Sequence, residues 1–93
     1  MALKLKFENA EGVKYNIIFL KPHKRYNAWG LCDPPECKKP KIWIDPKLKP
    51  KRELEVLIEE CFHAFCWEET EKKAGKFARE LAKVIMETGW KKD

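Results

Sequence analysis

The sequence predicts an α+β domain in which a small, mainly antiparallel sheet of three strands is followed by two helices. The first half of the chain alternates apolar and polar residues with the period of a strand and is rich in turn residues. The second half repeats its apolar residues at intervals of three and four, which is the period of a helix. A length of 93 residues gives room for one domain, spanning residues 1–93.

The three strands are expected at about 3–7, 13–20 and 41–45. The segments "LKLKF" and "VKYNIIFL" alternate in twos, and Gly12 between them supplies the turn of a hairpin. The third strand, "KIWID", stops at Pro46. Residues 21–40 contain several prolines and charges, which predicts a long loop. A loop of that length in a small domain is often functional.

The two helices are expected at about 51–67 and 70–88. Pro50 precedes the first, a position where proline is tolerated. Thr70 is expected to cap the second helix, with Glu71 in the first turn, where the helix dipole favours a negative charge. Gly89 has the place of the residue that ends such a helix.

Charge and composition limit the functions that the chain can have. The net charge of +5 permits loose association with nucleic acid, but the charge is mainly lysine, whereas base reading favours Arg, Asn and Gln. No apolar run is long enough for a bilayer, and the N-terminus lacks the apolar core of a signal peptide, so we expect a cytoplasmic protein. The four cysteines are then expected as free thiols, although Cys32 and Cys37 flank a Pro-Pro turn and could form a metal or redox pair.

The residues with the clearest chemistry are "EECFH" at positions 59–63 of the first helix. At about 100° per residue, Glu59, Glu60 and His63 share one face of the helix. Val56 and Trp67 flank this face, which predicts that it is covered rather than open. The opposite arc is expected to face the core and consists of Leu54, Leu57, Ile58, Cys61, Phe62 and Phe65.

Neighbouring carboxylates that are partly covered need a cation to stay ionised, and a metal ion is the simplest one. His63, one helical turn from Glu59, suits that role. The alternative is purely structural. In that case Glu59 pairs with a lysine of the long loop, Glu60 faces solvent, and His63 is a hydrogen-bonded core histidine.

The stretch from Ile42 to Trp90 resembles a family of small phage-type zincin-like proteins. Their extended strand, basic linker, HExxH helix and final helix correspond here to "IWID", "PKLKPKREL", "LIEECFHAFCWEETE" and "ARELAKVIMETGW". In zincins both histidines of HExxH bind the metal, and the glutamate between them is the general base. The resemblance therefore implies Glu60 as the catalytic base and His63 as a metal ligand. It places a third ligand after Trp67, with Glu71 as first choice and Glu68 as second.

The chain departs from the family at the first ligand position, where Glu59 replaces histidine. Glutamate can bind zinc, but a second carboxylate weakens the metal as a Lewis acid. A Glu/His/Glu set also tolerates manganese or magnesium, so zinc or another divalent metal is the expected cofactor. The substitution implies either a weakened hydrolase or a scaffold kept without turnover, and slightly favours the second.

Three functions follow from these observations. The first is a metal-dependent hydrolase of peptide bonds, with residues 21–40 closing the substrate cleft. The second is a catalytically inactive interaction module of phage origin that binds a host or virion protein. The third is a protein that binds single-stranded nucleic acid by a basic stretch with aromatic residues, which suits stacking on bases. That stretch consists of Lys21, His23, Lys24, Arg25, Tyr26 and Trp29.

The tryptophans are expected to be structural. Trp29, Trp43 and Trp67 are expected to form walls of the core and the cleft. Trp90 is expected to pack the last helix against the sheet.

Overall fold

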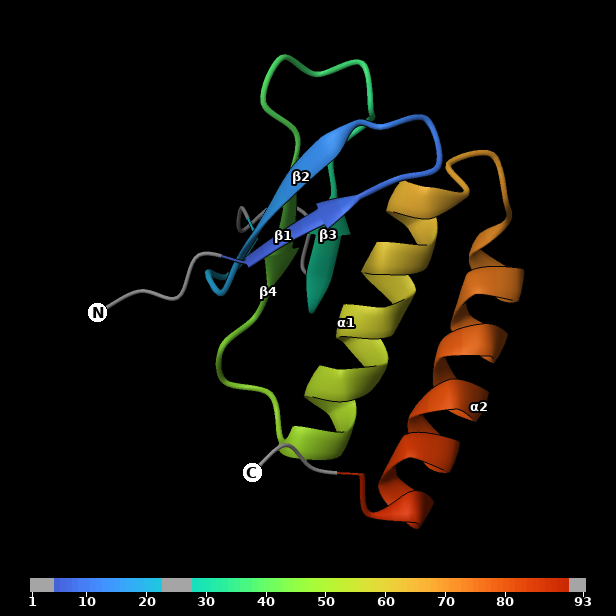
Figure 1. The fold of residues 1–93 in the computed structure, drawn as a ribbon. Coiled ribbons are helices and arrows are strands. Elements are labelled where there is room, and N and C mark those ends of the chain that lie inside the picture. The colour runs from blue at the N-terminus through green and yellow to red at the C-terminus, as the bar shows by residue number, and fades with distance from the viewer. Residues whose placement is uncertain (1–4, 23–27, 91–93) are drawn as a thin grey trace.

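The computed structural model describes residues 5–22 and 28–90 and confirms the α+β class (Figure 1). Four strands and two helices follow in the order β1 (Leu5–Glu8), β2 (Lys14–Ile18), β3 (Gly30–Cys32), β4 (Lys41–Ile44), α1 (Pro50–Phe65) and α2 (Glu71–Thr88). None of the described helices is both long and apolar enough to cross a membrane.

The sheet has four strands, in the order β1-β2-β4-β3, where the sequence predicted three. The hairpin of β1 and β2 is antiparallel, β2 runs parallel to β4, and β3 pairs antiparallel with β4 at the sheet edge. The missed strand, β3, lies inside the segment that was predicted to be a loop. It has three residues, too few to show an alternating pattern in the sequence.

The hairpin turn forms where the sequence predicted it. Gly12 has a φ of 86°, a left-handed conformation that glycine adopts without strain. The side chain of Asn9 accepts hydrogen bonds from the backbone N–H groups of Glu11 and Val13, at 3.0 and 2.8 Å. These bonds hold the turn closed and set the register in which Phe7 faces Tyr15.

The core lies between the sheet and α1. Tyr15 from β2 and Ile42 and Ile44 from β4 are completely buried, and Val56 and Ala64 from α1 pack against them. Helix α1 contacts β3 and β4, whereas α2 lies along α1 (Figure 1). Only small residues of α2 are buried, namely Ala74, Gly75, Ala78 and Ala82.

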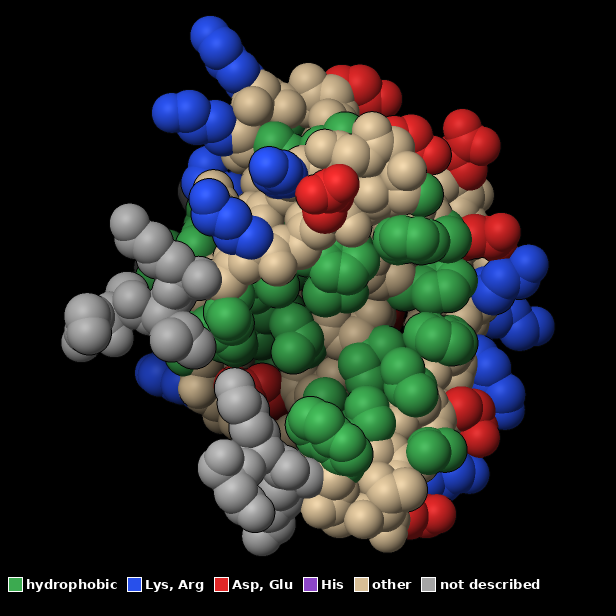
Figure 2. Space-filling view, viewed as in Figure 1, with side chains coloured by type: hydrophobic (Ala, Val, Ile, Leu, Met, Phe, Trp, Pro, Cys, Tyr) green, Lys and Arg blue, Asp and Glu red, His purple; other side chains and the backbone are tan. Residues whose placement is uncertain are grey.

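The predicted core arc of α1 is confirmed only in part. The buried residues of α1 are Val56, His63 and Ala64, which lie on the side that carries the acidic cluster. Of the predicted arc, Leu57 and Cys61 are partly buried and pack against the core, whereas Phe65 is 47% exposed. Figure 2 shows apolar side chains gathered on the face where β1, α1 and α2 lie. The helical wheel favoured the arc with the larger apolar residues, but α1 approaches the sheet through its smaller ones.

Both ends of α2 are as predicted, whereas the role expected for Trp90 is wrong. The Thr70 hydroxyl accepts a hydrogen bond from the Lys73 N–H at 3.1 Å, and Gly89 ends the helix with a φ of 65°. Trp90 is 72% exposed and therefore does not pack α2 against the sheet.

Gly30 allows α1 to approach β3 closely, which predicts a large effect of a single methyl group. A Cβ atom at this position would lie 2.6 Å from Cγ1 of Val56 and 3.1 Å from the carbonyl oxygen of Trp43. We expect Gly30→Ala to lower the free energy of unfolding by about 2 kcal/mol, because neither neighbour can move away freely. Urea denaturation would measure the change.

Gly75→Ala is the matched control for that measurement. In the interior of α2 a Cβ atom would meet only the flexible end of Arg79, at 3.2 Å. Alanine also favours a helix more than glycine does, so this variant should gain about 0.5–1 kcal/mol. Equal stability of Gly30→Ala and the unmodified protein would show that α1 and β3 are not closely packed.

Candidate metal centre

A cavity of about 660 Å³ lies between β3, α1 and the start of α2. Residues 28–32 form one wall, so the predicted long loop does line the cleft, while its residues 23–27 lie outside the described part of the chain. Helix α1 contributes Val56, Glu59, Glu60 and His63. The turn after α1 and the start of α2 contribute Trp67, Glu69 and Glu71.

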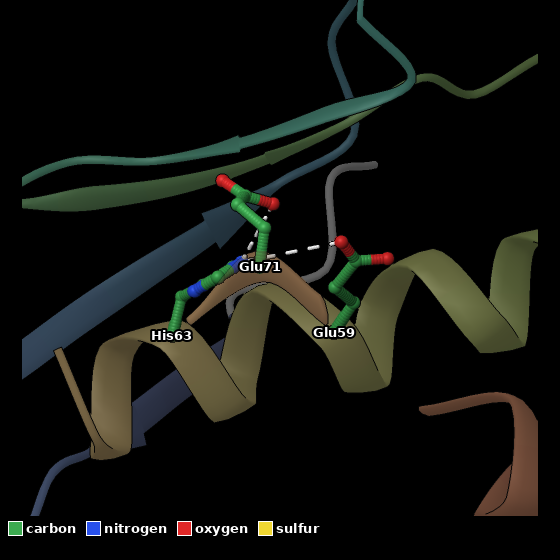
Figure 3. Close-up of side chains that lie close together, drawn as sticks. All are labelled: Glu59, His63 and Glu71. Carbon is green, nitrogen blue, oxygen red and sulfur yellow. Dashed lines mark ion pairs between the residues drawn. The ribbon is translucent and has the colours of Figure 1, made fainter. Parts of the chain in front are cut away.

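Three of these side chains converge (Figure 3). Nε2 of His63 lies 3.3 Å from Oε1 of Glu71 and 3.9 Å from Oε2 of Glu59. One ligand atom from each residue lies within 4.8 Å of the other two. Glu59 and His63 meet because they are four residues apart on α1. Glu71 reaches them because the turn capped by Thr70 brings the first turn of α2 back beside α1.

His63 is the innermost member of this group, which we call the Glu/His/Glu cluster. The residue is 9% exposed, and its Nε2 atom is buried without a hydrogen-bond partner in the described chain. The nearest oxygen, from Glu71, is outside hydrogen-bond geometry. A buried polar nitrogen without a hydrogen-bond partner destabilises the folded protein, and this nitrogen points at two carboxylates. A divalent metal ion at this point would compensate the two negative charges.

Exposure differs strongly across the cluster. The side chain of Glu59 is 31% exposed and that of Glu71 is 86% exposed. The cluster therefore has a buried nitrogen on the inside and a carboxylate open to solvent on the outside. Glu68, the alternative third ligand, does not line the cavity; it lines an adjoining pocket that shares Trp67 and Glu69 with the cavity. The structure thus brings together Glu59, His63 and Glu71, and it leaves Glu68 apart.

Glu60 lines the same cavity but is not part of the cluster. Burial raises the pKa of its carboxyl group to about 8, and the neighbouring Glu59 and Glu71 add to the effect. Burial also raises the pKa of Glu59, although His63 acts against the shift. Both residues are partly buried, so the expectation that this face of α1 is covered is confirmed in part.

The raised pKa of Glu60 predicts how stability varies with pH. The folded protein keeps this proton up to about pH 8, whereas the unfolded chain releases it near its usual pKa of 4.5. Because the folded state binds more protons in this range, stability falls as the pH rises through it. For each metal-free protein the free energy of unfolding is measured at pH 5 and at pH 8. We expect the value for Glu60→Gln, relative to that of the unmodified protein, to be roughly 3 kcal/mol higher at pH 8 than at pH 5. Urea denaturation at both pH values tests this, and a pH-independent difference would contradict it.

The cysteines do not form a pair. Cys32 is buried and Cys37 exposed, and all four cysteines are free thiols. Cys32 lines the cavity, but burial raises the pKa of its thiol to about 12. It therefore remains protonated at neutral pH, where a thiolate would be needed to bind a metal.

Some residues of the cavity lie on β3, the strand that was not predicted from the sequence. Gly30, Leu31 and Cys32 line it because β3 lies at the edge of the sheet, and no pattern predicted that strand. Trp29 and Trp67 do form walls of the cleft, as predicted. A count of the acidic residues between 67 and 72 would have included Glu69, but nothing in the sequence distinguishes it from Glu68.

The predicted nucleic-acid segment is only partly described. Lys21 pairs with Asp45 at 3.3 Å, and the guanidinium carbon of Arg52 lies 4.4 Å from the ring centroid of Trp29. The residues between, 23–27, lie outside the described chain. A function of this segment in nucleic-acid binding stays a prediction.

Comparisons of the chain with protein-family models, curated proteins and solved structures found no match. The resemblance to zincin-like proteins therefore stays a prediction, based on the motifs quoted above.

Proposed function

We propose that the protein binds one divalent metal ion through Glu59, His63 and Glu71 and uses it to hydrolyse a peptide bond, with Glu60 as general base. The observation that supports this most is the buried, unpartnered Nε2 of His63, which faces two carboxylates at 3.3 and 3.9 Å. One imidazole nitrogen and two carboxylate oxygens are a suitable donor set for zinc and for harder divalent ions.

The cluster has the composition of a catalytic rather than a structural metal site. Structural zinc sites are closed by four protein ligands, whereas catalytic sites use three and leave a position open. The third residue here, Glu71, is 86% exposed, so solvent and substrate can reach this side of the cluster. An ion bound there would supply a Lewis acid that polarises a substrate carbonyl.

Glu60 is the residue of this cavity best suited to move a proton. It lines the cavity beside the cluster without belonging to it. With a pKa of about 8, Glu60 keeps its proton at neutral pH in the metal-free protein, and a cation bound beside it would favour the ionised form that a general base needs. In the proposed reaction Glu60 takes a proton from the attacking water and passes it to the leaving amine.

The edge of the sheet offers a place for an extended substrate. The Asp45 N–H donates to the carbonyl of Trp29, and the Asp33 N–H donates to the carbonyl of Lys41. In an antiparallel ladder, successive residues alternate between hydrogen-bonding to the neighbouring strand and pointing their backbone groups away from it. The backbone groups of Gly30 and Cys32 therefore point away from β4. This edge borders the cavity, where a peptide could pair with it as an added strand.

The proposal is tested by calorimetric titration of metal-free protein with zinc and manganese. We expect one ion per chain. We also expect Glu59→His to raise zinc affinity at least about tenfold, because zinc prefers imidazole to a further carboxylate at such sites.

Glu68→His is the matched control, since it adds the same side chain outside the cavity. It should leave zinc affinity unchanged. Failure of the unmodified protein to bind either ion, or equal zinc affinity of Glu59→His and the unmodified protein, would refute the assigned ligands.

A further inference from the structure

The cavity is strongly acidic although the chain as a whole is basic. Among the described residues, its lining contains four carboxylates and no lysine or arginine, whereas the net charge of the chain is +5. The carboxylates are Glu59, Glu60, Glu69 and Glu71. They outnumber the two positive charges of a divalent ion even if Glu60 keeps its proton. The cavity therefore favours a cationic ligand in addition to the metal and disfavours phosphates and acidic side chains.

Two exposed tryptophans border the same cavity. Trp29 is 51% exposed and Trp67 is 40% exposed, and they come from opposite sides, before β3 and after α1. Trp29 already holds a cation of the protein: its carbonyl accepts a 2.8 Å hydrogen bond from the Asp45 N–H, and the Arg52 guanidinium lies over its ring, 4.4 Å from the centroid. Trp67 is therefore the ring that we assign to a substrate cation. The indole ring is the side chain that attracts cations most strongly through its face.

We infer that the cavity recognises a positively charged group of its substrate, held against Trp67 with Glu69 as the counter-charge. The group is an ammonium or guanidinium, from a lysine or arginine side chain or from the amino terminus of a peptide. The inference rests on the proposed function, because the reacting bond would lie in the same cavity. The inference adds a substrate class to the proposed function, namely basic peptides.

Among the described residues, two cations lie near these carboxylates without lining the cavity. The Lys73 ammonium is 3.1 Å from Glu69, and the charge of Arg79 acts on Glu59. The side chains of Lys73 and Glu69 are 65% and 40% exposed, and such exposed pairs contribute little free energy. A substrate cation can therefore replace Lys73 at Glu69 at little cost.

The test measures peptide binding rather than turnover. Four hexapeptides of alanine are compared, each with one changed residue near the centre. Three are blocked at both ends and carry lysine, norleucine or glutamate. The fourth carries norleucine and has a free amino terminus. Binding is followed by the indole N–H signals in NMR spectra, for the metal-free and the zinc-loaded full-length protein, and the metal content of the same samples tests the proposed function separately.

We expect the blocked lysine peptide, the free-amino peptide or both to bind at least about tenfold more tightly than blocked norleucine, with glutamate weakest. The better of the two cationic peptides identifies the source of the charge. Glu69→Gln and Trp67→Ala should each reduce this preference at least about threefold, because each removes one part of the recognition site. Glu68→Gln, the neighbouring control outside the cavity, should preserve it.

Several results would overturn the inference while leaving the metal site intact. These are equal binding of the lysine, free-amino and blocked norleucine peptides, no binding of any peptide, or an unchanged preference in both Glu69→Gln and Trp67→Ala. A protein that selects the cationic peptides but binds no metal would retain this inference and refute the proposed hydrolase.

Discussion

The His63→Ala variant is expected to bind divalent metal ions at least about 100-fold more weakly than the unmodified protein. His63 supplies the only nitrogen of the cluster and the innermost of its three ligand atoms. Without it, two carboxylates remain, and one of them is mostly exposed to solvent. Calorimetric titration with zinc measures the loss directly.

His63 is buried, so its removal can also change the fold, and a second variant keeps the test decisive. The Glu71 side chain is 86% exposed, so Glu71→Gln should fold normally, with an unchanged circular dichroism spectrum. It should still lose metal affinity about tenfold, because a neutral amide oxygen replaces a charged ligand. Glu68→Gln is the control and should bind as the unmodified protein does. Full zinc affinity in both His63→Ala and Glu71→Gln would rule out the cluster as the metal site.

Glu60→Gln is expected to lower the rate of peptide hydrolysis by about 100- to 10,000-fold, the usual contribution of a general base. Metal affinity should stay within about threefold, because Glu60 lines the cavity but is not one of the converging ligands. Glutamine has nearly the same shape, yet it cannot accept the proton. Fluorogenic peptides with a central lysine, incubated with zinc- or manganese-loaded protein, provide the assay.

The same assay separates the hydrolase from an inactive binding module. Glu68→Gln should retain full activity, since Glu68 lies outside the cavity. If the unmodified protein binds one metal ion but cleaves no peptide of the panel, the hydrolase is refuted and the metal site stands. Equal activity of Glu60→Gln and the unmodified protein would instead show that another group moves the proton.

The parts of the site that were predictable from the sequence depend on local geometry. The spacing of Glu59 and His63 places them on one face of a helix whatever the rest of the chain does. Thr70 caps α2 through a side chain that contacts only the next few residues. The choice of Glu71 over Glu68 came from the resemblance, and the structure brings Glu71 to His63.

The parts that were missed depend on contacts between distant segments. β3 is a strand because β4 pairs with it, and its three residues have no strand pattern of their own. The side of α1 that faces the sheet follows from the close approach at Gly30 rather than from the size of the apolar residues of the helix. Trp90 is exposed because α2 packs mainly on α1, which no local pattern reveals.

X-ray absorption at the zinc edge, on protein loaded with one equivalent of zinc, tests the central claim most directly. We predict a first shell of one imidazole nitrogen from His63 and carboxylate oxygens from Glu59 and Glu71, at about 2.0–2.2 Å, without sulfur. The imidazole signal should disappear in His63→Ala. A shell containing sulfur at about 2.3 Å would place the metal on the cysteines and contradict the account.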